Sequence, residues 1–180
     1  MTGLATPLSH LAVPLALSVA LGPDIVPPGL MALALVCAVL PDLDALGLWL
    51  GIPYDHPFGH RGITHSLPFA VALADVGALL APALGVDVSI AFWVLLPSAA
   101  SHGLLDALTN GGLGIALFAP FSSRRYFLPW RVIEVSPLRP SELFSRRGLR
   151  VLRSEMRWVW APCGVLALAG LAVRGLAGPV

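Results

Sequence analysis

Long apolar runs, separated by short stretches rich in turn-forming residues, dominate the chain. A membrane-spanning helix needs about 20 mostly apolar residues. Five stretches approach that length: residues 4–22, 28–50, 63–85, 88–108 and 159–177. Gly, Pro and Asp gather between them, as is typical of turns. The pattern predicts an all-α, polytopic membrane helical bundle of about five transmembrane helices, forming one membrane-embedded domain over residues 1–180.

The composition supports this interpretation and excludes other classes of protein. Hydrophobic residues make up 57% of the chain and charged residues 12%, with a mean hydropathy of +0.83, whereas soluble domains carry about 25% charged residues. An ordinary soluble domain and a disordered chain are therefore both excluded. Two cysteines, Cys37 and Cys163, lie inside apolar runs and are expected to be small buried thiols. No basic residue precedes the first apolar run and no small-x-small cleavage site follows it, so we expect a retained helix.

The charge is distributed unevenly. Nine of the eleven basic residues, all of them arginine, lie in residues 122–158, where three glutamates oppose them and leave a net charge of +6. Three prolines and the strand-like run 131–135 interrupt this segment, so we expect a partly irregular surface excursion. The positive-inside rule predicts that the segment is cytoplasmic. The N-terminus and the 51–62 loop are then cytoplasmic as well.

Ionisable side chains inside the apolar runs are the candidates for function. Each costs at least about 2.5–3.5 kcal/mol to insert into a membrane, so its presence calls for a role. Seven of them fall toward the predicted cytoplasmic side: His10, Asp42, Asp44, His60, His65, His102 and Asp106. Mixed imidazole and carboxylate ligands suit Zn²⁺ or Mn²⁺, so these residues predict a centre for one or two ions. Asp75, deep in the third run, is left outside this set.

The spacing of the candidates adds detail. His102 and Asp106 are four residues apart and share one face of a helix. Asp42 and Asp44 follow a helix-breaking proline, Pro41, and two interpretations stay open: an acidic cap on a new helix, or carboxylates that hold a cation. One of these two aspartates could instead act as a general base. The two histidines at 60 and 65 are too far apart for one helix face, so we expect one of them in a loop.

A cluster of polar residues around the third apolar run predicts substrate contacts. Arg61 is the only basic residue among the first 123, and its guanidinium suits the binding of a phosphate. Thr64 and Ser66 are candidates for substrate binding, with helix capping as the alternative.

Three motifs together resemble the YdjM-like family of bacterial inner-membrane, metal-dependent hydrolases. They are Pro41-Asp42-Leu43-Asp44, His60-Arg61-Gly62-Ile63-Thr64-His65-Ser66 and Ser101-His102-Gly103-Leu104-Leu105-Asp106. The resemblance runs from about residue 10 to residue 137 and includes stretches 120–125 and 135–137. The order of the ligands is also similar, more loosely, to the helical zinc-dependent phospholipase C and P1-nuclease group, whose further ligands have no assigned counterpart here. The family resemblance implies a hydrolase in the bacterial inner membrane.

These observations predict a membrane-bound, metal-dependent hydrolase that cleaves a phosphoester, possibly lipid-linked, with a metal-activated water. Asp42, Asp44 and Arg61 are the predicted catalytic residues. Membrane lipids are the expected partners, with an anionic or phosphorylated lipid as substrate, and no nucleic-acid partner is predicted. Two alternatives stay open. One is a transporter of metal ions or protons that uses the same buried cluster. The other is a non-catalytic membrane protein that uses the metal as a structural staple or recruits partners through its Arg-rich segment.

Overall fold

The computed structural model of the chain describes residues 6–136 and 145–177. Helices account for the regular structure in these residues, with two isolated β-bridges and no strand. In chain order the elements are α1 (Pro7–His10), α2 (Ala12–Leu21), α3 (Pro28–Val39), the 3-10 helix η1 (Leu40–Asp44), α4 (Ala45–Trp49), the 3-10 helices η2 (Ile63–His65) and η3 (Ala81–Leu84) on either side of α5 (Leu67–Ala78), α6 (Val88–Ala107), α7 (Arg146–Glu155), the π-helical turn η5 (Met156–Trp160) and α8 (Ala161–Ala177).

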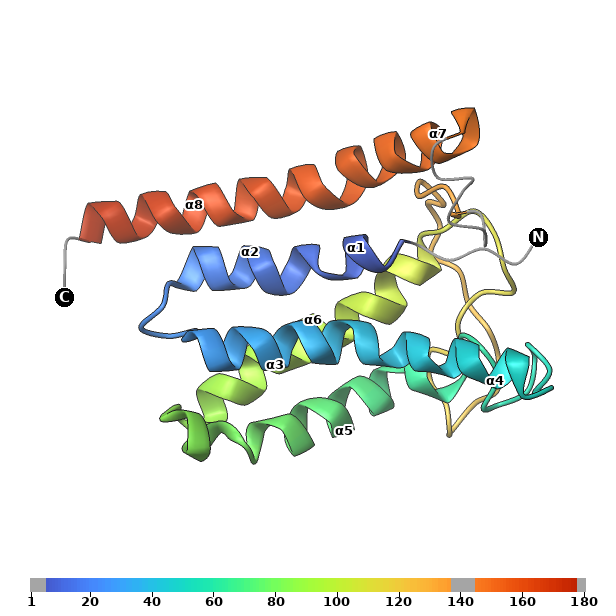
Figure 1. Ribbon diagram of the computed structural model, residues 1–180, viewed down its shortest axis with the longest axis horizontal. Helices are drawn as coiled ribbons and strands as arrows, with labels where there is room; N and C mark the ends of the chain where they lie inside the picture. Colours follow the sequence, from blue (N-terminus) through green and yellow to red (C-terminus); the bar gives the residue numbers. More distant parts are fainter. Residues whose placement is uncertain (1–5, 137–144, 178–180) are drawn as a thin grey trace.

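The bundle is built around α6. Helices α5, α3 and α2 pack against it, and α8 lies along α2 (Figure 1). Small residues fill the contacts between helices, with Ala34, Ala74 and Ala91 all fully buried, because small side chains let helix backbones approach closely in a membrane. Large apolar side chains face outward instead, as Trp93 and Leu79 do. This arrangement confirms the predicted helical membrane bundle.

Three of the described helical segments are long and apolar enough to cross a membrane: Pro28–Trp49, Val88–Ala107 and Arg146–Leu176. The first two agree with the predicted segments 28–50 and 88–108. Two shorter apolar segments, Pro7–Leu21 and Leu67–Ala78, fall where the other predicted spans begin. The number of spans therefore stays a prediction.

Prolines account for a break within the first of these segments and for the end of the second. Pro14 has no N–H to donate to the carbonyl of His10, four residues earlier, and the chain breaks between α1 and α2. Pro82 stands in the same relation to Ala78, the last residue of α5. Helix α5 has only 12 residues, a length of about 18 Å at 1.5 Å per residue.

The Arg-rich segment differs in part from the prediction. Residues 122–136 are irregular as expected, but 146–158 are helical and continue into α8. Ser145 caps this helix by accepting a hydrogen bond from the Gly148 N–H, and no proline follows until α8. The run 131–135 forms no strand; Ile133 instead makes one parallel bridge to Thr109, just after α6. Pro137 and Pro140 lie outside the described residues.

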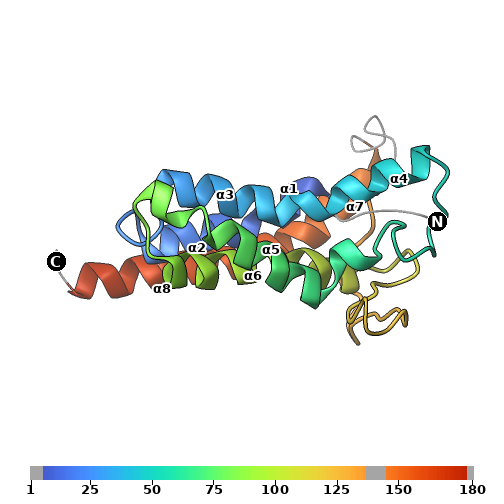
Figure 2. The ribbon, with the colours of Figure 1, turned by 90° about the horizontal axis from the view of Figure 1, so that it is seen from below.

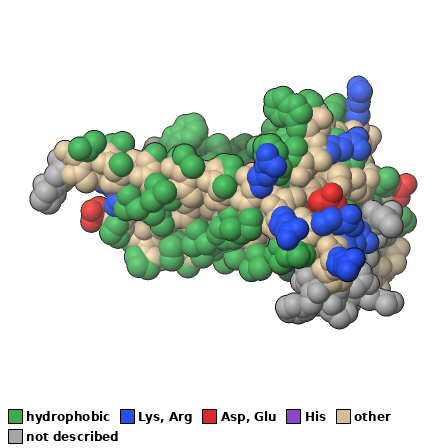
Figure 3. Space-filling model, turned by 90° about the horizontal axis from the view of Figure 1, so that it is seen from above, with side chains coloured by type: hydrophobic (Ala, Val, Ile, Leu, Met, Phe, Trp, Pro, Cys, Tyr) green, Lys and Arg blue, Asp and Glu red, His purple; other side chains and the backbone are tan. Residues whose placement is uncertain are grey.

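The two ends of the bundle differ in character. At the α4 end lie α4, the start of α1, the end of α6 and α7, and at the far end lie the α2–α3 turn and the end of α8 (Figures 1 and 2). Arginine side chains gather at the α4 end, whereas hydrophobic side chains cover much of the visible flank (Figure 3). The loops predicted to share one side of the membrane thus lie at one end of the bundle.

Candidate metal centre

All seven predicted ligands come together at the α4 end. Asp42 and Asp44 lie on the tight 3-10 turn η1, which the proline at its second position begins. His60 belongs to the loop after α4 and His65 to η2. The spacing of the two histidines predicted that one of them lies in a loop. The other three are His10 at the end of α1 and the pair His102 and Asp106 in the last turns of α6.

Four of these residues form a compact group of ligand atoms. Asp42, His65, His102 and Asp106 each offer one atom, and the four atoms lie within 4.8 Å of one another. The Nε2 atoms of His65 and His102 are 3.0 Å apart. Asp42 Oδ1 lies 3.4 Å from His102 Nε2, and Asp106 Oδ2 lies 3.3 Å from His65 Nε2. Metal bonds of about 2.0–2.1 Å in a tetrahedral site separate neighbouring ligand atoms by about 3.3 Å, so the group fits a single ion.

Backbone and carboxylate contacts hold both imidazoles with Nε2 toward this group. His102 Nδ1 lies 2.7 Å from the carbonyl oxygen of Ala38, and His65 Nδ1 lies 3.1 Å from Asp44 Oδ2. A ring N–H that donates at Nδ1 leaves the lone pair of Nε2 for a metal, and such outer contacts orient metal-binding histidines in proteins.

Asp44 is the centre of a second layer of contacts. Its carboxylate also accepts hydrogen bonds from the Arg61 backbone N–H at 3.2 Å and from the Thr64 hydroxyl, and it lies 2.6 Å from His60 Nδ1. Asp44, His60 and His65 Nδ1 form a second group that could hold an ion. The same contacts also suit a carboxylate that orients His65. The two aspartates therefore differ in position: Asp42 belongs to the group of four ligand atoms, and Asp44 contacts Nδ1 of His65.

Helix capping was the alternative role for the two aspartates and for Thr64 and Ser66. Neither Asp42 nor Asp44 makes a side-chain cap hydrogen bond at η1 or α4. Ser66, in contrast, caps α5 by accepting a hydrogen bond from the Phe69 N–H at 3.2 Å, and its hydroxyl donates to the Ile63 carbonyl. Substrate binding by Thr64 and Ser66 stays a prediction, and the hydroxyl groups of both residues are engaged within the protein.

Arg61 lies inside the protein beside the metal-binding group. Its side chain is fully buried, and Nη2 forms an ion pair of 2.9 Å with Asp106 Oδ1. Nη1 donates to Thr109 Oγ1 and to the Gly111 carbonyl, each at 3.0 Å. The guanidinium is therefore a structural partner of a candidate ligand, and its predicted contact with a substrate phosphate stays a prediction.

His10 lies beside the group of four residues, against the ring of His102. Its ring stacks on that of His102 with the centroids 3.8 Å apart, and it is completely buried. Neither ring nitrogen has a hydrogen-bond partner in the described part of the chain, and the same holds for both oxygens of Asp42 and for His60 Nε2. Buried polar atoms normally have partners, so this concentration of unsatisfied ligand atoms fits a cation site.

Of the four grouped residues, Asp42 has the most exposed side chain. The Asp42 side chain is 17% exposed, whereas the side chains of the other three grouped residues are at most 1% exposed. On the opposite side, α6 approaches η2 so closely that a Cβ added to Gly103 would lie 2.2 Å from the carbonyl oxygen of His65. A glycine at position 103 thus allows His102 to reach His65.

Arg125 is a site residue that sequence reasoning missed. Its guanidinium donates to four backbone carbonyls: those of Tyr54, His60, Arg61 and Gly114, at 2.9–3.3 Å. It also lies over the Tyr54 ring. Burial lowers the pKa of Arg125 and raises the pKa of the Tyr54 phenol. The family resemblance included Arg125 within stretch 120–125 but gave it no role, because contacts with distant carbonyls leave no local pattern.

Arg125→Gln is expected to loosen the loop that carries His60. Hydrogen bonds to a charged group contribute about 1.5–3 kcal/mol each, and a glutamine cannot span all four carbonyls. We expect a lower melting temperature and weaker metal retention, measured by thermal unfolding in detergent and by mass spectrometry of bound metal. Arg124→Gln is the matched control, since Arg124 is exposed and its guanidinium lies over the ring of Tyr126. Equal behaviour of the two variants would contradict the assigned role.

Comparison with known proteins agrees with the motifs. The sequence profile of a family described as "YdjM inner membrane protein" matches residues 5–178. The chain belongs to the YdjM family. The inner membrane protein YbcI of Escherichia coli (strain K12) is 39% identical over 167 residues, which are 92% of this YdjM-family chain and 96% of the relative. No solved structure matches the chain.

Family membership confirms the resemblance and extends it beyond residues 10–137 to nearly the whole chain. It also identifies the YdjM-family chain as an inner membrane protein. Both names state a location and no reaction, so any activity has to be argued from the chemistry of the cluster.

Proposed function

We propose that this YdjM-family protein is a membrane-bound, metal-dependent hydrolase that cleaves a phosphoester. The observation that carries the proposal is the group formed by Asp42, His65, His102 and Asp106, whose ligand atoms are spaced like the corners of one coordination shell. Two imidazoles and two carboxylates favour Zn²⁺ or Mn²⁺ over Ca²⁺ and Mg²⁺, which prefer oxygen ligands. When bound, such an ion supplies Lewis acidity and a hydroxide nucleophile near neutral pH.

The side chains of the cluster have distinct parts to play. His65, His102 and Asp106 are buried and would hold the ion when it is bound. Asp42 has the most exposed side chain of the four, so it can bind the ion with one oxygen and accept a proton from the attacking water with the other. Asp44 keeps the proton of His65 on Nδ1.

The position of the cluster supports a lipid-linked phosphoester as substrate. It lies at the α4 end of an apolar bundle, where α6 ends and α7 begins (Figure 1), and lipid phosphates lie just outside the hydrocarbon core. The arginines at the same end support a cytoplasmic placement.

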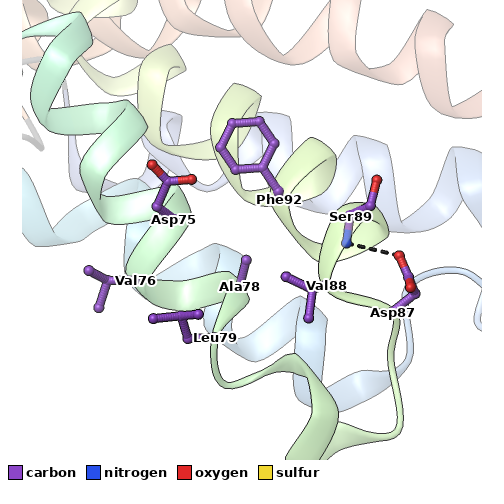
Figure 4. Close-up of a pocket in the computed structure, with 8 residues that line it drawn as sticks. All are labelled: Asp75, Val76, Ala78, Leu79, Asp87, Val88, Ser89 and Phe92. Atoms are coloured by element: carbon purple, nitrogen blue, oxygen red, sulfur yellow. Dashed lines mark hydrogen bonds between the residues drawn. The ribbon is translucent and has the colours of Figure 1, made fainter.

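The rival function, transport of a metal ion or protons, needs polar groups across the bundle. At the far end, Asp75 lines a groove between α5 and α6 together with Asp87 and Phe92 (Figure 4). Asp87 caps α6 by accepting from the Ser89 and Ile90 N–H groups, which accounts for its presence. Among the described residues, both groups suited to an ion lie at the α4 end, which favours hydrolysis.

The proposal is tested with purified full-length protein and a panel of phosphate esters, including phosphatidic acid, phosphatidylglycerol and a polyprenyl diphosphate. We expect release of phosphate or alcohol from at least one lipid, loss of this turnover with a chelator, and recovery with Zn²⁺ or Mn²⁺. Metal uptake by proteoliposomes without turnover of any ester would overturn the proposal in favour of transport.

A further inference from the structure

A line of arginines follows one face of the helix that leads into α8. Arg146, Arg150, Arg153 and Arg157 are separated by four, three and four residues, so they share one side of α7 and η5, and all four are exposed. None of them forms an ion pair with a described residue. We call these four residues the arginine stripe.

Glu155, the acidic residue on this helix, does not neutralise the charge of the arginine stripe. Glu155 is 2% exposed and lies on the buried face with Gly148 and Val151. Its two carboxylate oxygens accept hydrogen bonds of 2.7 Å from the Thr6 N–H and the Thr6 hydroxyl. Glu155 therefore fastens α7 to the start of α1 and points away from the arginines.

The remaining face of the helix is apolar and exposed. It carries Leu149, Leu152 and Met156, and Trp158 follows with the guanidinium of Arg157 over its ring. Exposed apolar side chains beside arginines suit a helix that passes through the boundary of the apolar core, where a long arginine side chain keeps its charged end among the headgroups. Tryptophan is enriched at the same level of the membrane.

The arginine stripe also lies close to the point where the apolar part of the helix begins. Helix α8, which begins at Ala161, continues the same helical rod into the apolar segment. At about 1.5 Å per residue, Arg157 and Arg153 precede Ala161 by about 6 and 12 Å, so they are the two members of the stripe nearest to the apolar segment, which the headgroup layer adjoins. Arg150 and Arg146 lie further out, where their attraction to charged lipids is screened by salt.

We propose that the arginine stripe binds the phosphates of anionic phospholipids in the leaflet nearest the metal centre. This inference does not depend on the reaction that the centre carries out. The charge of the stripe, its exposure and its place at the end of an apolar helix all match a lipid surface, and the inner pair of arginines carries more of the binding than the outer pair.

The test compares the association of spin-labelled phosphatidylglycerol and phosphatidylcholine with full-length protein in phosphatidylcholine vesicles. An arginine near a charged membrane surface contributes a factor of about five to lipid affinity. We expect a clear preference for phosphatidylglycerol, a several-fold loss in R153Q/R157Q, and a smaller loss in R146Q/R150Q. The preference of the wild type is expected to weaken as the salt concentration rises.

Arg131→Gln is the matched control, because Arg131 is exposed at the same end of the bundle and its guanidinium lies over the Phe127 ring. All the changed arginines are exposed, so thermal unfolding in detergent is expected to match that of the wild type. An unchanged preference for phosphatidylglycerol in both double variants would overturn the proposal and leave the stripe as a signal for membrane topology alone. A loss in the Arg131 variant as large as in R153Q/R157Q would overturn it as well.

Discussion

His102→Ala is expected to remove nearly all bound metal and to abolish hydrolysis. The Nε2 atom of His102 lies 3.0 Å from His65 Nε2 and 3.4 Å from Asp42 Oδ1, so its loss removes one corner of the ligand group. Loss of an orienting contact alone costs about 10- to 100-fold in metal affinity or activity, and loss of a ligand is expected to cost at least the upper end of that range. Mass spectrometry of metal per chain and lipid-phosphate turnover measure the two effects.

Two further variants separate loss of metal from loss of fold. Asp42→Asn keeps the shape of the side chain at the exposed edge of the cluster and is expected to lower metal content while helicity stays unchanged. Asp75→Asn, at the exposed far-end groove (Figure 4), is expected to retain full metal and activity. Turnover that persists after both chelation and the loss of His102 would refute the metal mechanism.

Much of the fold could be predicted because a membrane makes simple demands on a sequence. Apolar runs of sufficient length identified the helices at 28–50 and 88–108 directly. The early break at residue 11 and the shortness of α5 follow from Pro14 and Pro82, whose effect depends on whether the helix would otherwise continue. The helical part of the Arg-rich segment was missed because prolines nearby and a high charge suggested an irregular loop throughout.

The residues of the candidate site could be predicted for a related reason. Which of them form the ligand group and which of them orient the ligands could not. A charged group within an apolar run is costly, so His10, Asp42 and the other candidates stood out. Whether an aspartate joins the group of four ligand atoms or contacts Nδ1 of a histidine depends on the 3-10 turn at η1, which places Asp42 and Asp44 on different sides. Arg125 reaches its carbonyls through tertiary contacts alone, so no local pattern could have identified it.

Arg61→Met is expected to destabilise the fold strongly. The variant removes the guanidinium that lies 2.9 Å from the buried carboxylate of Asp106 and leaves His65 Nε2, at 3.3 Å, as a remaining neighbour. Breaking a buried ion pair on one side costs about 3–5 kcal/mol. Arg61 has a positive φ of 62°, and methionine meets the same backbone constraint, so the comparison reports the loss of the guanidinium: its charge and its hydrogen bonds to Thr109 and the Gly111 carbonyl. Thermal unfolding in detergent, with a chelator present so that metal does not contribute, measures the effect.

The double variant R61M/D106L decides between the two roles open to Arg61. If the guanidinium serves mainly as the partner of Asp106, removing both charges is expected to recover much of the stability that Arg61→Met loses, since a buried ion pair can be replaced by apolar residues at little cost. Metal binding is expected to stay lost, because Asp106 is a candidate ligand. If Arg61 instead binds the substrate phosphate, Arg61→Met is expected to keep its melting temperature and to raise KM, and that result would restore the interpretation made from the sequence.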